Sequence, residues 1–361
     1  MEQLCDTIQM LDLIVQPALC VKGGRIIKLN QAAQHLLLSP DGDINSLLLT
    51  GKEEYAAFEG GCLYLTMNIA GQSFGASVTR MGELDVFLLD QEAEQAELQA
   101  MALAARELRE PLASVMISAE RLFPMTGPEV DPQMRDQAAR LNRGLMQLLR
   151  IVTNMSDASR CSAATPDHQE LRDVSAFMRE IFCKTEELAT YAGITLGYTG
   201  PDAPVFSLID SQLLERAVLN ILSNALKFTP KGGRIEAKLS QSQRGNKLIL
   251  TVQDNGQGIA PELRGNVFHR YLRQPALEDS RYGIGLGMVL IRSAAAQHGG
   301  TVLIDQPCET GTRLTLTLAL RQDTTALVRA NALRIDYAGE RDHTLIELSD
   351  CLPAAAFDVK K

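Results

Sequence analysis

Two asparagines and a lysine stand at helical spacing in the segment NILSNALKFT. Asn220 and Asn224 are four residues apart and would share one face of a helix, with Lys227 nearly one turn further on. Amide oxygens can ligate Mg²⁺, and a lysine ammonium is suited to phosphate oxygens. The spacing therefore fits a site for a magnesium-bound phosphate, although a solvated helix face would carry the same pattern.

Glycine-rich segments follow in a fixed order. DNGQGI begins at Asp254, after the strand pattern KLILTVQ, and its glycines would let the backbone pass close to a flat ligand whose amino group Asp254 could bind. GIGLG, residues 283–287, opens a helical pattern, and free N–H groups at a helix N-terminus attract phosphate oxygens. ETGTRLTLTL then brings Gly311 and Thr312 into the last strand. One such segment is usually an ordinary turn, so the prediction of a nucleotide site rests on the ordered set.

The region 169–321 must position these motifs, and it alternates helical with strand patterns, which predicts an α/β sandwich. Ahead of it, from Ala18 to about Asp90, five short strand patterns predict a small α+β unit with an antiparallel sheet, in which Asn30 caps a helix over QAAQHLLL. After Arg321, the runs ALRIDYA and HTLIELSD read as strands and suggest a β-hairpin. The domains expected are 1–90, 91–160, 169–321 and an extension, 322–361.

Between the two sheet regions, residues 91–160 carry apolar residues at alternating spacings of three and four, the heptad pattern of paired helices. The first series is Leu98, Met101, Ala105, Leu108, Leu112, Val115, Ala119 and Leu122, and the second is Met134, Ala138, Leu141, Leu145, Leu148, Val152 and Met155. PMTGPEVDP separates them, so we expect an antiparallel helical hairpin. Its seam is too long for two helices to cover, and pairing with a second copy would make a four-helix bundle.

Composition excludes several classes of protein. The chain has 361 residues, and 35 Lys and Arg against 44 Asp and Glu give a net charge of −9, which argues against a nucleic-acid partner. No apolar run approaches the ~20 residues that a membrane helix needs, and the N-terminus lacks the pattern of a secretory signal, so we expect a cytoplasmic protein. The seven cysteines form no C-x-x-C pair, which fits neither a zinc site nor a disulfide framework.

Together, the four motifs resemble the N, G1, G2 and G3 boxes of the histidine-kinase catalytic domain, a member of the ATPase superfamily shared with Hsp90-type chaperones, MutL and type II topoisomerases. NVFHRYLRQ resembles the F box of that domain, with Phe268 and Tyr271 at its aromatic positions. The resemblance implies ATP and Mg²⁺ as cofactors: Asn224 would hold Mg²⁺ with help from Asn220, Asp254 would contact adenine, and Lys227 would bind phosphate. It assigns further nucleotide contacts to Gly256, Gly258, Ile259, Arg273, Gly283, Gly285, Leu286, Gly287 and Thr312. Residues 270–282 would form a lid, and His269 and His298 would be packing residues.

The segment RELREPLASV resembles the H box of dimerising histidine-kinase hairpins, usually H-E-L-R-x-P-L. Its Glu107 would join Asn224 and Lys227 as a catalytic residue, but Arg106 stands at the position of the phosphoacceptor histidine. A guanidinium stays protonated and cannot attack the γ-phosphate. None of the five histidines of the chain lies between residues 91 and 160, so autophosphorylation of this hairpin is not expected.

The N-terminal unit resembles a PAS sensor domain by the order of its strands and helices. The resemblance as a whole implies a sensor histidine kinase-like signalling protein that binds Mg-ATP and acts through a dimer partner, itself or a related kinase, or through a response regulator. One alternative is an active kinase that phosphorylates a partner or a non-standard acceptor. Another is an ATPase of chaperone or DNA-repair type, or an anti-sigma-like serine kinase, which would need neither the H-box remnant nor the PAS-like unit.

Overall fold

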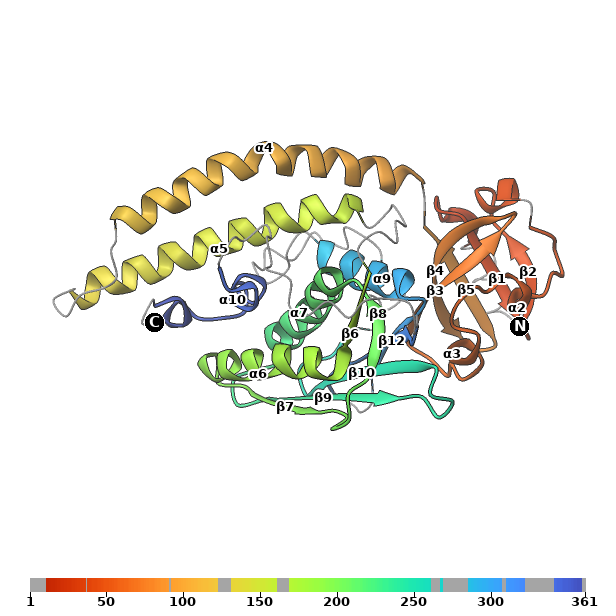
Figure 1. Cartoon of the computed structure of the whole chain (residues 1–361). Coiled ribbons are helices and arrows are strands. Elements are labelled where there is room, and N and C mark those ends of the chain that lie inside the picture. Colours follow the sequence, from red (N-terminus) through yellow and green to blue (C-terminus); the bar gives the residue numbers. More distant parts are fainter. Residues whose placement is uncertain are drawn as a thin grey trace.

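A ten-stranded sheet runs through the computed structural model, in the order β2-β1-β5-β4-β3-β11-β12-β10-β9-β7 (Figure 1). The structure describes residues 11–36, 38–90, 92–122, 131–160, 169–260, 267–268, 285–306, 310–321 and 341–358. Five strands of the sheet come from the N-terminal unit and five from the region that carries the nucleotide motifs. A separate two-stranded sheet pairs β6 (Glu170–Asp173) with β8 (Phe206–Ile209).

The N-terminal unit is an antiparallel sheet, and all five predicted strands are confirmed. They are β1 (Ala18–Lys22), β2 (Arg25–Leu29), β3 (Cys62–Ile69), β4 (Gln72–Met81) and β5 (Leu84–Leu89), with short helical segments at η1 (Leu11–Leu13), η2 (Ala33–Leu36), α2 (Ile44–Leu47) and α3 (Lys52–Ala56). The helix expected over QAAQHLLL is only the 3₁₀ turn η2. Asn30 does accept from the N–H of Ala33, but the same oxygen accepts from Ala18, and its amide donates to the carbonyls of Ile14 and Gln16. The side chain therefore ties strand segments together rather than starting a long helix.

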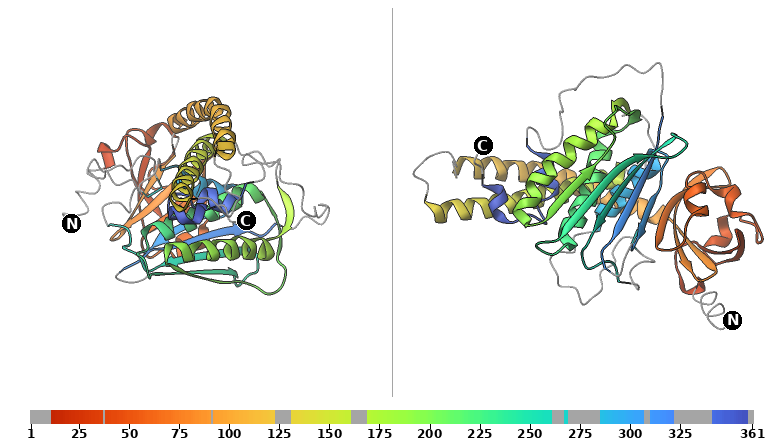
Figure 2. Two further views of the ribbon diagram at one scale, coloured as in Figure 1. Left: turned by 90° about the vertical axis from the view of Figure 1, so that its left-hand side faces the viewer. Right: turned by 90° about the horizontal axis from the view of Figure 1, so that it is seen from below.

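Two long helices, α4 (Glu92–Leu122) and α5 (Pro132–Arg160), lie side by side (Figures 1 and 2). Met116, Ala119, Leu145 and Leu149 form a buried cluster between them. Only part of each predicted seam is buried between the two helices. The exposed members of the two seams are Leu108, Val115, Leu122, Met134, Leu141 and Leu148.

The region with the nucleotide motifs is a sheet covered by helices, as Figure 2 shows from below. Its strands in the large sheet are β7 (Thr195–Thr199), β9 (Arg234–Gln241), β10 (Lys247–Asp254), β11 (Val302–Asp305) and β12 (Arg313–Ala319), and its helices are α6 (Val174–Ala192), α7 (Ser211–Phe228) and α9 (Leu286–Gln297). Alternate residues of β10, beginning with Leu248, are buried against the helices. Asp254 continues this alternation at the end of the strand, so its carboxylate lies on the buried side.

The two halves of the large sheet meet where β3 pairs with β11 in antiparallel register, Tyr64 opposite Val302. The approach is close: a Cβ on Gly61, which has a φ of +91°, would lie 2.3 Å from the carbonyl oxygen of Ile304. Arg292 of α9 reinforces the junction, because its guanidinium donates to Asp90 at 2.8 Å and lies over the Tyr64 ring. The N-terminal unit is thereby docked on the motif-bearing sheet.

The C-terminal extension is helical where it is described. HTLIELSD, predicted as a strand, contains the helix α10 (His343–Glu347), and the turn η3 (Ala354–Phe357) follows. The strand prediction was wrong because Asp342 caps the segment, accepting from the N–H groups of Thr344 and Leu345. The run ALRIDYA lies outside the described residues.

Candidate functional site

One face of α7 carries the polar residues of the first motif. Asn220 is only 1% exposed and donates from its amide to the carbonyl of Arg216, one turn earlier. Asn224 and Lys227 are half-buried further along the helix. Gly287 of α9 lies against Asn220, since a Cβ at that glycine would come within 2.8 Å of the asparagine Oδ1. The absence of a side chain at Gly287 therefore lets α9 pack close to the polar face of α7.

Asp254 lies at the junction of the second and fourth motifs. Its Oδ1 accepts from the N–H of Gly256 at 2.8 Å and from the N–H of Thr312 at 3.2 Å. Burial raises the pKa of this carboxyl, and the two hydrogen bonds oppose that shift. Among the described residues, Oδ2 makes no hydrogen bond that would compete with a ligand's amino group.

Glycines bring the motif backbones together around Asp254. A Cβ on Gly256 would lie 2.4 Å from the carbonyl oxygen of Phe228, the last residue of α7. A Cβ on Gly311, which has a φ of +90°, would lie 2.2 Å from the carbonyl oxygen of Asp254. Gly258 has a φ of +75° and stands beside Gly311. The first, second and fourth motifs are thus in direct contact, as a single nucleotide site requires.

The third motif is described only in part. Gly285, with a φ of +80°, is the N-cap of α9. Because glycine has no side chain, the N-cap residue provides no acceptor for the first backbone N–H groups of the helix. Leu286 is buried and clusters with Leu98 of α4. Gly283 and Arg273, both predicted contacts, lie outside the described residues, as do His269 and the whole of the expected lid, residues 270–282.

His298 has the packing role expected of it. Its Nε2 accepts from the N–H of Asp210, the N-cap of α7, and its Nδ1 pairs with the carbonyl of Ala294. Burial lowers the pKa of the ring, which therefore stays neutral and ties the end of α9 to the start of α7.

The H-box residues stand apart from this assembly. Arg106 and Glu107 lie on the exposed surface of α4, and Pro111 sits inside the same continuous helix. In the described part of the chain, no hydrogen bond or ion pair joins Arg106 or Glu107 to α7. The predicted catalytic role of Glu107 remains a prediction.

Sequence reasoning missed a charged cluster on α7. Arg150 of α5 donates to Asn220 at 3.3 Å and to Ser223 at 3.1 Å, and Glu347 of α10 accepts from both Arg150 and Arg216. Arg216 and Asn220 are four residues apart on α7, so the sequence could have indicated that Arg216 lies beside Asn220. Arg150 and Glu347 are 70 and 127 residues away from Asn220, where no local pattern reaches.

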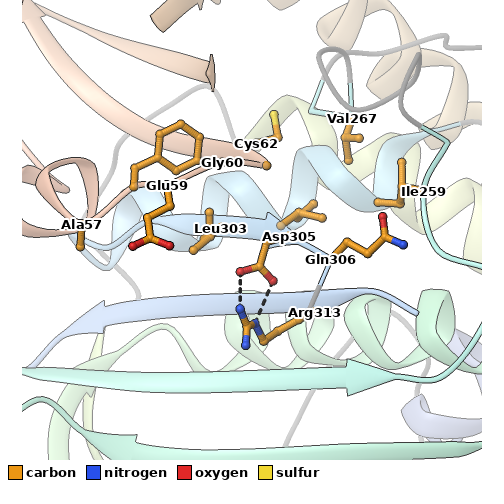
Figure 3. Close-up of a pocket in the computed structure, with 13 residues that line it drawn as sticks. Ala57, Glu59, Gly60, Cys62, Ile259, Val267, Leu303, Asp305, Gln306 and Arg313 are labelled. Carbon is orange, nitrogen blue, oxygen red and sulfur yellow. Dashed lines mark hydrogen bonds and ion pairs between the residues drawn. The ribbon is translucent and has the colours of Figure 1, made fainter. Parts of the chain in front are cut away.

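A cavity of about 540 Å³ opens where the N-terminal unit meets the second motif (Figure 3). Ile259 and Val267 line one side, and Cys62 of β3 lines another. Asp305 and Arg313 form an ion pair at 2.6 Å within it. Ile259, a predicted nucleotide contact, therefore borders both the second motif and this cavity.

Parts of the chain match known proteins. Residues 209–322 match the family model of the histidine kinase-, DNA gyrase B- and HSP90-like ATPases. The chain carries an ATPase domain of the kind that histidine kinases, DNA gyrase B and HSP90 share. It is 30% identical over 243 residues to the sensor histidine kinase TmoS of Ectopseudomonas mendocina, and 32% identical over 237 residues to the signal transduction histidine-protein kinase/phosphatase MprB of Mycolicibacterium smegmatis. These alignments cover 66% and 63% of this chain. The chain is thus similar to sensor histidine kinases over about two thirds of its own length.

The fold also resembles that of a solved structure. Full-length ShkA in complex with AMPPNP matches with a TM-score of 0.50 and 22% identity, over 62% of this chain and 46% of that one. The match supports the mixed α/β fold. The chain spans 25% of TmoS and 46% of MprB, so it corresponds to less than half of either relative. None of the described helices combines the length and apolar character that crossing a bilayer requires.

Proposed function

We propose that the chain is a sensor histidine kinase-like signalling protein that binds Mg-ATP in its ATPase domain and cannot phosphorylate its own helical hairpin. The observation that carries the nucleotide half of this proposal is the buried Asp254 carboxylate. Two backbone N–H groups hold one oxygen, and the other is left to bind an adenine amino group. The AMPPNP in the ShkA structure is consistent with nucleotide binding in this fold.

The residues of α7 fit a magnesium-bound triphosphate. Asn224 offers an amide oxygen, and Lys227 offers an ammonium about one turn away, both half-buried on α7. Mg²⁺ would neutralise phosphate charge when bound. Asn224 would hold the ion, and Lys227 would orient the phosphates, together with the α9 backbone from Gly285 to Gly287.

The signalling half of the proposal rests on Arg106. The side chain is exposed on α4, where an acceptor would have to be, yet a guanidinium is not a nucleophile. The ATPase domain would therefore act on an acceptor elsewhere, on a partner kinase or through a response regulator. The relatives are sensor kinases, which favours this reading over an ATPase of chaperone or DNA-repair type.

The elements around the ATPase domain support a sensor and a dimer. The antiparallel order β2-β1-β5-β4-β3 fits a PAS-like sensor domain. In α5 the predicted seam residues alternate between buried and exposed: Ala138, Leu145 and Val152 are buried, while Met134, Leu141 and Leu148 are 39–51% exposed. An apolar row left open in this way suits the facing hairpin of a second copy in a four-helix bundle.

Action on a partner is tested with two complementary variants of this chain. Arg106→His/Asn224→Ala offers an acceptor but lacks the proposed Mg²⁺ ligand, whereas the native chain offers the ligand but no acceptor. After co-refolding, we expect γ-labelled ATP to label the double variant only when the native chain is present, at least tenfold above either protein alone. Mixed dimers, verified by an affinity tag on one chain, that carry no label would contradict action in trans.

A further inference from the structure

The C-terminal extension occupies the polar face of α7. α10 contacts both α5 and α7, and η3 packs along α5; Figures 1 and 2 show this segment beside α5 at the end of the chain. Ile346, Leu348 and Leu352 are fully buried, Ile346 in the cluster between α4 and α5 and the other two in the core of the ATPase domain. The segment is therefore anchored by apolar side chains to both parts of the protein.

Glu347 places a carboxylate among the side chains of the first motif. It is 0% exposed and accepts from Arg216 at 3.2 Å, from Arg150 at 3.3 Å and from the amide of Asn220 at 3.5 Å. A buried carboxylate is stable only with such partners. Arg150 and Asn220 thus each have a donor directed at the extension.

Asp350, one turn later, reaches the lysine of the motif. Its Oδ2 lies 2.5 Å from a guanidinium nitrogen of Arg150 and 4.0 Å from Nζ of Lys227. Arg143 and Gln147 of α5 donate to the carbonyls of Ser349 and Asp350 and hold the backbone in place. Asp350 therefore faces the lysine proposed to bind phosphate, and Glu347 holds the amide group of Asn220.

We propose that residues 342–352 are an autoinhibitory segment whose carboxylates compete with Mg-ATP for Asn220 and Lys227 and hold α5 against α7. The proposal rests on nucleotide binding at this site. The carboxylates of Glu347 and Asp350 present to the cationic groups the same charge as phosphate oxygens, so the docked segment and the nucleotide exclude each other. Release of the segment would open the nucleotide site. It would also loosen the contact between α7 of the ATPase domain and α5 of the hairpin.

A reversible disulfide tests this competition in the full chain. The Cys351 thiol donates to the carbonyl of Leu348 at 3.1 Å and lies near Ser223 of α7, and burial raises the pKa of the thiol to about 11. In Ser223→Cys, oxidation should join the two cysteines and lock the segment on α7. We expect the locked form to bind a fluorescent ATP analogue with Mg²⁺ at least tenfold more weakly than the same variant after reduction, while the native chain responds to neither treatment. Equal affinity of the locked and reduced forms would overturn the proposal.

The variant Asp350→Asn should weaken the docking of the segment on α5 and α7, and it needs no engineered disulfide. Its side chain is 29% exposed, so the fold should tolerate the change, and loss of the carboxylate removes the pairs with Arg150 and Lys227. We expect nucleotide affinity to rise severalfold, with Asp358→Asn, which lies just after η3 and outside the segment and this cluster, as the unchanged control. Unaltered affinity in Asp350→Asn would count against competition. Failure of every form, reduced or loosened, to bind nucleotide would instead refute the proposed function.

Discussion

Arg106→His is expected to convert an unlabelled chain into one that takes up phosphate from γ-labelled ATP. The change replaces a permanently protonated guanidinium with an imidazole, which is largely neutral at pH 7.5 and can attack phosphorus. The position is exposed on α4 beside Glu107, so a new acceptor there is reachable. Acid-labile label should exceed that of the native chain at least tenfold at saturating Mg-ATP.

Two further variants make the Arg106 result specific. Arg106→Lys keeps the positive charge without a neutral nucleophile and should stay unlabelled. Adding Asn224→Ala to Arg106→His should remove the label, because that asparagine is the proposed Mg²⁺ ligand. If Arg106→His binds nucleotide as the native chain does but carries no label, α4 does not present an acceptor to this ATPase domain.

Asp254→Asn should weaken nucleotide binding by about 10- to 100-fold, since a hydrogen bond to a charged group contributes roughly 1.5–3 kcal/mol. The substitution keeps an oxygen for the N–H groups of Gly256 and Thr312, so the fold should survive. Calorimetric titration with a non-hydrolysable ATP analogue measures the loss. Asp305→Asn, a paired carboxylate at the end of β11, is the matched control and should change little. A native affinity in Asp254→Asn would place adenine elsewhere.

The affinity should also depend on pH through Asp254. Burial raises the pKa of this carboxyl, so it takes up a proton at a higher pH than an ordinary aspartic acid. Nucleotide binding, which needs the carboxylate, should fall as the pH drops through that raised pKa. The stability of the unliganded protein has the opposite sign, because a raised native pKa contributes stability at low pH that is lost as the pH rises through it. Asp254→Asn should abolish both trends.

Much of the site follows from local patterns. The alternation of KLILTVQD places Asp254 on the buried side of β10, and the four-residue spacing of Asn220 and Asn224 places both on α7. The glycines are decisive because other backbones approach to within 3 Å of where a Cβ would be, as at Gly256 and Gly311. Such positions can be recognised in the sequence because they are glycines.

Contacts between residues far apart in the sequence could not be predicted from local patterns. Arg150 and Glu347 meet on α7 although neither lies near it in the sequence. The segment HTLIELSD, predicted as a strand, is a helix because Asp342 caps its first turn. The pairing of β3 with β11 likewise joins two regions that were expected to be separate domains. Heptad spacing identified α4 and α5 but could not say which seam residues, such as Leu108, would stay exposed.

We expect this ATPase domain to bind Mg-ATP while its own hairpin accepts no phosphate. The most direct test incubates the purified native chain with Mg²⁺ and γ-labelled ATP beside a nucleotide titration of the same preparation. We predict saturable binding with one nucleotide per chain and no covalent label after removal of free nucleotide. Label retained by the native chain would contradict this expectation by revealing another acceptor. Absence of nucleotide binding would also contradict it, because the domain would then not bind Mg-ATP.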